Sequence, residues 1–83
     1  MMNNTKNDLK PLPHAPSKKL LCEMYWYYDA EFLKQEINRI IRHNRGIAKG
    51  KIVWAKTIRH IEFERFVEFM KEFPKGYEKE FRK

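Results

Sequence analysis

The feature that most constrains the fold is an apolar stripe near the carboxyl end of the chain. Its residues recur at spacings of three, four and seven, the pattern of one buried helix face: Phe63, Phe66, Val67, Met70 and Phe73. Pro74 and Gly76 follow and would end a helix. We therefore predict a core helix from about Ile61 to Phe73. Its glutamates at successive spacings of four, Glu64, Glu68 and Glu72, are typical of a solvent-facing stripe rather than of catalytic carboxylates.

A second amphipathic helix is predicted from Ala30 to about His43. Asp29 is a suitable N-cap, and Glu31 places a negative charge in the first turn, where it suits the helix dipole. Gly46 is well placed to end the helix in a left-handed conformation. The apolar residues that would form the inner face are Leu33, Ile37, Ile40 and Ile41.

Two segments are harder to assign. After Ser17, a possible cap, apolar residues recur at helical spacing, but the run Met24 to Tyr28 is rich in the aromatic residues that strands favour, so residues 18 to 28 form either a helix or a strand. The stretch Gly46 to Ile58 is rich in β-branched residues, and Lys49 with Gly50 is suited to a turn. We predict a short basic hairpin, or wing, there.

The length of 83 residues allows one small domain. Residues 1–16 contain three prolines and few apolar groups, which predicts a flexible arm that docks by Leu9 and Leu12. The domain itself is expected over residues 17–76, with a tail over 77–83. The predicted fold class is mainly α with a small β-hairpin, in a compact winged-helix-like domain.

Several classes of function are disfavoured. The single cysteine, Cys22, excludes an intramolecular disulfide, and the chain lacks an apolar leader or a run long enough to cross a bilayer, so we expect a cytoplasmic protein without a membrane partner. Cys22 and the three histidines, His14, His43 and His60, have no metal-site spacing. Phosphate loops and nucleophile motifs are also missing. We predict no metal, no cofactor and no enzymatic activity.

The net positive charge is concentrated between Lys34 and Arg59. This window holds eight basic residues and one acid, Glu36, which gives +7, whereas the segments on either side are each neutral. A basic field bounded by neutral surface is what a polyanion-binding site requires, because it fixes which face meets the phosphates.

The residue types in this window predict contacts to double-stranded DNA. Arginine and asparagine on an exposed helix can read base edges in the major groove, so we assign base contacts to Asn38, Arg39 and Arg42. The other cations would hold phosphates: Lys34, Arg45, Lys49, Lys51, Lys56 and Arg59. Trp54 either packs in the core or stacks on bases, and the second alternative favours a single-stranded target.

The order of a helix, a basic helix over Ala30 to His43, a basic wing over Gly46 to Ile58 and an amphipathic helix over Ile61 to Phe73 resembles the winged-helix domains of phage and mobile-element excisionases and related MerR-like regulators. The resemblance implies a small architectural protein that binds DNA with a recombinase or with a second copy of itself and regulates recombination or transcription. The alternative is an adaptor or inhibitor that docks on an acidic protein surface, because complementary charge also steers protein association. RNA binding ranks lower, since the aromatic sheet motifs of common RNA-binding modules are missing.

Overall fold

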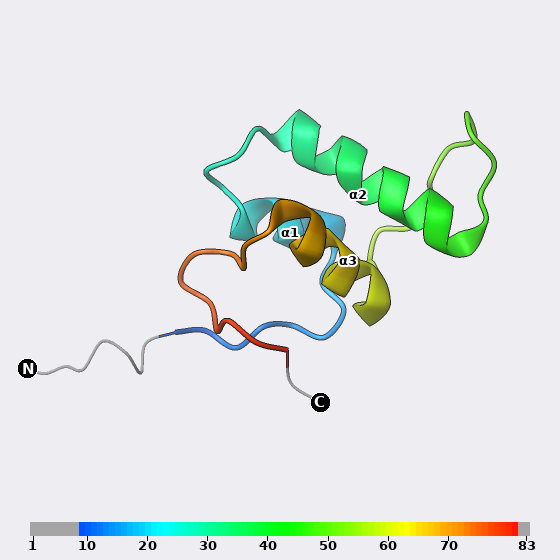
Figure 1. Cartoon of the computed structure of the whole chain (residues 1–83). Helices are drawn as coiled ribbons and strands as arrows, with labels where there is room; N and C mark the ends of the chain where they lie inside the picture. Colours follow the sequence, from blue (N-terminus) through cyan, green and yellow to red (C-terminus); the bar gives the residue numbers. More distant parts are fainter. Residues whose placement is uncertain (1–8, 82–83) are drawn as a thin grey trace, which may run out of the picture.

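Three helices form the framework of the protein in a computed structural model that describes residues 9–81. Helix α1 spans Lys18–Met24, α2 spans Ala30–Arg45 and α3 spans His60–Met70. The long helix α2 packs on both α1 and α3, and the 46–59 segment forms a loop beyond its carboxyl end (Figure 1). The described residues form no sheet, so the mainly helical part of the predicted fold is confirmed and the β part is not.

The helix ends follow from local side-chain chemistry. Ser17 caps α1 by accepting a hydrogen bond of 3.0 Å from the Leu20 N–H. Asp29 caps α2 in the same way through the Phe32 N–H, also at 3.0 Å. Gly46 ends α2 with a φ of 68°, a left-handed conformation that favours glycine. Residues 18–28, for which the sequence left two alternatives, form the short helix α1 and then a turn.

Helix α3 ends three residues earlier than predicted, at Met70, because two tyrosines hold the chain that follows. The Tyr25 hydroxyl donates to the Glu72 carbonyl oxygen at 2.7 Å, and the Tyr28 hydroxyl donates to the Glu72 carboxylate. Lys71 turns the chain out of the helix with a φ of 62°. Since these tyrosines lie more than forty residues away in sequence, helical periodicity alone could not locate this end.

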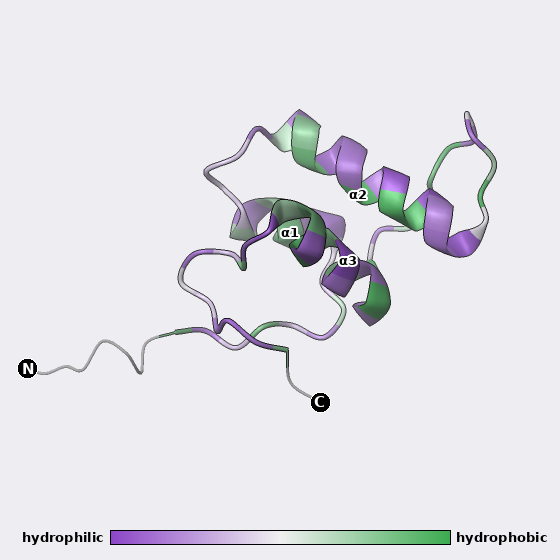
Figure 2. Ribbon diagram, viewed as in Figure 1, coloured by the Kyte–Doolittle hydropathy of each residue, from purple (hydrophilic) through white to green (hydrophobic). Residues whose placement is uncertain are grey.

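The core lies where the three helices meet. Hydrophobic residues of α2 alternate along the helix with hydrophilic ones, as Figure 2 shows, and the hydrophobic ones include its buried face. Tyr25 packs edge-on against Phe66, with ring centroids 5.3 Å apart. Burial of these large side chains supplies most of the driving force in so small a domain. The buried hydrophobic residues are Leu21, Met24, Tyr25, Leu33, Ile37, Ile40, Ile41, Ile58, Phe63, Phe66 and Val67.

The predicted arm and tail contact each other. The Lys10 N–H donates to the Gly76 carbonyl oxygen and the Glu78 N–H donates to the Lys10 carbonyl oxygen, both at 2.9 Å. Phe81 packs edge-on against Phe63, with ring centroids 5.3 Å apart. These described parts of the arm and tail therefore close the underside of the helical core (Figure 1). The rest of the arm and tail, residues 1–8 and 82–83, lies outside the described residues.

The predicted hairpin between residues 46 and 58 is not formed. Its first arm, between Gly46 and Lys49, is too short for a stable strand. Instead, the end of the segment pairs with the residues that precede α1: the Lys18 N–H donates to the Lys56 carbonyl oxygen at 2.8 Å. The 46–59 segment is thus an extended loop whose end is hydrogen-bonded to the residues before α1. The structure does not contain the two-stranded wing that the resemblance to winged-helix domains implies.

Candidate nucleic-acid interface

Two grooves meet on one side of the molecule and share Lys18 and Lys19 at the start of α1. One, of about 730 Å³, lies between α1 and α2, and the other, of about 590 Å³, lies between α1 and the 46–59 loop. Because they share two residues, we treat them as one surface and call it the lysine groove. It is lined by Ser17, Lys18, Lys19, Cys22, Glu23, Trp26, Ala30, Lys34, Asn38, Ile52, Val53, Trp54, Ala55 and Lys56.

The lysine groove carries positive charge without matching acids. It contains four lysines and one glutamate, Glu23, and the ion pairs formed within residues 9–81 involve none of these lysines. Partial burial and the nearby guanidinium groups of Arg45 and Arg42 lower the pKa of Lys18. The Lys18 ammonium donates a hydrogen bond of 3.4 Å to the Val53 carbonyl oxygen. Unlike an ordinary solvated surface, this one has a field that favours an anion.

A second basic cluster lies at the base of the loop and is compensated. Glu62 is 1% exposed, and its two carboxylate oxygens accept hydrogen bonds of 2.8 Å each from the Arg45 guanidinium. The Asn44 amide and the Arg59 backbone N–H also donate to this carboxylate, at 2.9 and 2.7 Å. We call these four groups the Glu62 cluster. Each of the two carboxylate oxygens therefore accepts two hydrogen bonds, which compensates the cost of burying the charge.

The pKa values in the Glu62 cluster reflect this pairing. Burial alone would raise the pKa of Glu62, but hydrogen bonds from Arg45, the Arg59 backbone and Asn44 outweigh it and hold that pKa below its ordinary value. The hydrogen bond to Glu62 in turn raises the pKa of Arg45. Arg45 was predicted to bind phosphate, yet its side chain is only 20% exposed and is already paired.

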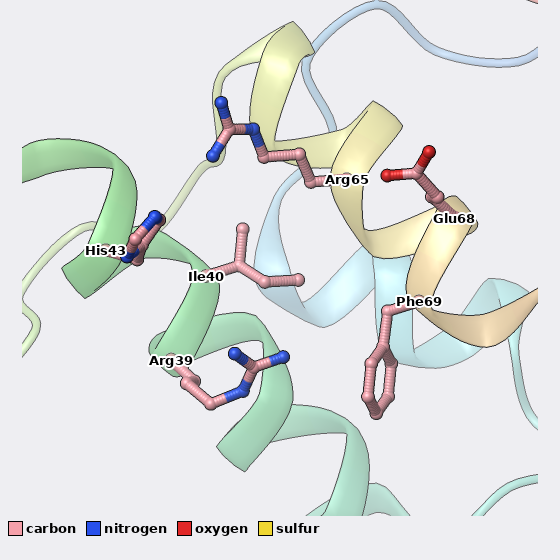
Figure 3. A pocket seen from close by; sticks show the side chains of 6 residues that line it. All are labelled: Arg39, Ile40, His43, Arg65, Glu68 and Phe69. Atoms are coloured by element: carbon pink, nitrogen blue, oxygen red, sulfur yellow. The ribbon is translucent and has the colours of Figure 1, made fainter.

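Arg39 lies apart from the other predicted base-reading residues. It lines a separate groove of about 350 Å³ between α2 and α3, together with His43 and Arg65 (Figure 3). Its guanidinium pairs with Glu36 at 2.7 Å and lies 5.5 Å from the centroid of the Phe69 ring. The structure therefore does not bring Arg39 together with Asn38, which lines the lysine groove.

The remaining predicted site residues lie on or beside the lysine groove or on the loop. Lys34, Asn38 and Lys56 line the groove. The Oδ1 of Asn38 is buried and is an acceptor without a hydrogen-bond partner among residues 9–81. The Arg42 guanidinium donates to the Lys51 carbonyl oxygen at 3.2 and 3.3 Å, which fixes the loop against α2. Three other predicted phosphate-binding cations lie outside the groove and are exposed: Lys49, Lys51 and Arg59.

Sequence reasoning missed three residues of this surface: Lys18, Lys19 and Trp26. The two lysines lie in a segment whose charges cancel along the chain, and only the fold brings them beside the basic window. A signal was present in Trp26, because the run of four aromatic residues from Tyr25 to Tyr28 exceeds what one small core can bury. Trp54, for which two roles were open, is 81% exposed and does not pack in the core.

The chain was compared with protein-family models, curated proteins and solved structures. No family model, curated protein or solved structure matches this chain. Among residues 9–81, no three potential metal-ligating side chains of His, Cys, Asp or Glu gather at one point. No helix in this part of the chain has the length and apolar character needed to span a bilayer.

Proposed function

We propose that this chain is a small DNA-binding protein that holds phosphates on the lysine groove and on the basic side chains beside it. The observation that carries the proposal is the uncompensated charge of the groove, where four lysines face one glutamate. Partial burial, and then repulsion by the nearby guanidinium groups of Arg45 and Arg42, lower the pKa of Lys18. A bound phosphate would relieve this repulsion and release counterions from the DNA.

The proposed phosphate contacts differ from those predicted from sequence alone. Arg45 and Arg39 are left out, because each is paired with a glutamate within the chain. Asn38 and Arg42 keep their proposed role beside the bases, which requires that their side chains turn toward the DNA. The proposed phosphate-binding residues are Lys18, Lys19, Lys34, Lys49, Lys51, Lys56 and Arg59.

In this proposal α2 enters the major groove of a duplex and the 46–59 loop takes the place of a wing on the neighbouring backbone. The helix has 16 residues, and Lys34 and Asn38 both line the groove along one of its sides. The excisionase-like role belongs to the same proposal: a cytoplasmic factor that acts by binding rather than by catalysis, needs no cofactor, and directs recombination or transcription together with a recombinase or a second copy of itself.

A second candidate function is docking on an acidic protein surface. The observation that favours it is the apolar character of the loop, where Ile52 and Trp54 are 64% and 81% exposed beside Lys56. An apolar anchor surrounded by charge is also typical of protein interfaces. The two candidate functions predict different binding behaviour: a DNA-binding protein should prefer DNA to an acidic polypeptide, whereas a protein that docks on an acidic surface should show no preference for a DNA sequence.

The test is fluorescence anisotropy with labelled DNA, titrated at several salt concentrations between 50 and 200 mM. We expect affinity to fall with a slope of about 0.9 in log–log terms for each phosphate contacted. Lys19→Ala and Lys56→Ala should each reduce this slope by about one. Lys79→Ala is the matched control, because Lys79 is also exposed but lies between two glutamates on the C-terminal segment. Absence of DNA binding at the lowest salt would overturn the proposal.

A further inference from the structure

The lysine groove carries two large exposed rings that phosphate binding does not explain. Trp26 and Trp54 are 71% and 81% exposed, and they line the two halves of the groove that share Lys18 and Lys19. An indole costs free energy when its apolar surface faces water, and large exposed apolar patches mark binding sites. Two exposed indoles on one surface are therefore suited to a ligand with an apolar face.

The chemistry between the two rings limits what that ligand can be. Lys18 and Lys19 line both halves of the groove, Lys34 lines the half that contains Trp26, and Lys56 lines the half that contains Trp54. Besides the two rings, Cys22 and Ala30 line one half of the groove and Ile52, Val53 and Ala55 line the other. The matching ligand alternates flat π-faces with negative charges, as a nucleotide strand does.

Resting on the proposed function, we infer that the lysine groove binds an unpaired segment of DNA, with bases stacked on Trp26 and Trp54 and phosphates held by the lysines between them. Paired bases in a duplex are stacked on one another and offer only their edges to a protein. A groove with exposed indoles gains from the π-faces that become available only in a single strand. The preferred ligand is accordingly a duplex with a single-stranded extension.

The experiment uses intrinsic fluorescence together with anisotropy. Trp26 and Trp54 are the two tryptophans of the chain, so tryptophan emission reports on the groove alone. The full chain is titrated with a blunt, fully paired two-stranded duplex, the same duplex with an unpaired extension, and the extension alone. We expect quenching with the two DNAs that contain unpaired bases, and affinity at least about ten-fold higher for the extended duplex than for the blunt one.

Two variants separate stacking from folding. Trp54→Ala should weaken binding of the extended duplex by about five-fold or more and leave the blunt duplex unchanged. Phe69→Ala is the matched control, because Phe69 is also an exposed ring, 40% accessible, but lies on α3 outside the lysine groove. Since Trp54 is exposed on a loop, Trp54→Ala should retain the thermal unfolding midpoint of the parent chain.

The outcomes distinguish the two proposals. If the blunt duplex binds as tightly as the extended one, without quenching and with a salt slope that depends on Lys56, then the DNA-binding proposal holds and the stacking inference is wrong. If no DNA binds at low salt, the DNA-binding proposal itself fails. Tighter binding of an RNA strand of the same sequence, or equal competition by poly-glutamate, would overturn the assignment of the groove to unpaired DNA.

Discussion

The Glu62 cluster and the lysine groove both contain basic side chains, but the positive charge is neutralised in the first and left without a matching acid in the second. In the Glu62 cluster, the buried carboxylate of Glu62 accepts two hydrogen bonds from Arg45 and one from Asn44. In the lysine groove, Lys18 and its neighbours have no acidic partner within ion-pair distance among residues 9–81. The two regions are near enough for Arg45 to lower the pKa of Lys18.

The difference lies partly in the cations themselves. Arginine presents a rigid, planar fork that matches a carboxylate at two points, so it suits the buried pair with Glu62. Lysine is a strongly hydrated point charge on a flexible stem, which keeps its ammonium in water until an anion arrives. Charge near the Glu62 cluster thus stabilises the fold, whereas charge in the lysine groove is available to a ligand.

The largest expected effect comes from removing the charge at the centre of the Glu62 cluster. Glu62→Gln should reduce the free energy of unfolding by roughly 2 to 3 kcal/mol, because Arg45 is left without its counter-charge. The loss is below that of a fully buried pair, since the Arg45 side chain retains some solvent contact. Urea denaturation followed by circular dichroism measures it. The control is Glu64→Gln, at a more exposed position on the same helix. An equal decrease in the free energy of unfolding in both variants would show that the buried pairing of Glu62 adds no stability beyond that of an exposed glutamate.

Acidification should weaken the Glu62 cluster in a defined range. The pKa of Glu62 lies below its ordinary value of 4.5 in the folded protein. Its ionised form therefore stabilises the fold fully above about pH 4.5, and this contribution is lost as the pH falls through the lower, folded-state pKa. The stability difference between the parent chain and Glu62→Gln should narrow as urea denaturation is repeated from pH 7 down to pH 3. A difference that stays constant with pH would contradict the assignment.

The smallest expected effect is in the lysine groove. Lys34→Ala and Lys56→Ala should each change the free energy of unfolding by no more than about 0.5 kcal/mol, because both side chains are exposed and form no ion pair with residues 9–81. The same substitutions should still weaken DNA binding if the proposed function is right. A decrease in the free energy of unfolding as large as that of Glu62→Gln would mean that these lysines stabilise the fold and are not available to a ligand.

Local rules predicted the parts of the fold that depend on neighbouring residues. The caps Ser17 and Asp29 and the left-handed Gly46 lie where the sequence placed them, since each acts within one helical turn. Phe63, Phe66 and Val67 of the predicted apolar stripe are buried in the core as predicted, whereas Met70 and Phe73 are only partly buried against it. The predictions for the end of α3 and for a hairpin in the 46–59 segment were wrong. Hydrogen bonds between residues far apart in sequence, to Glu72 and to the residues before α1, fix the conformation of these two segments.

The sequence by itself determined that this chain forms amphipathic helices around an aromatic core and that its basic residues cluster in one window. Only the tertiary structure decided which of those charges remain available. Glu62 lies 17 residues beyond Arg45 and neutralises it, and Lys18 lies 35 residues before Val53 yet joins the loop to form the groove. Helix caps and periodicity act over a few residues, but charge compensation depends on distance in space, which only the packed chain fixes.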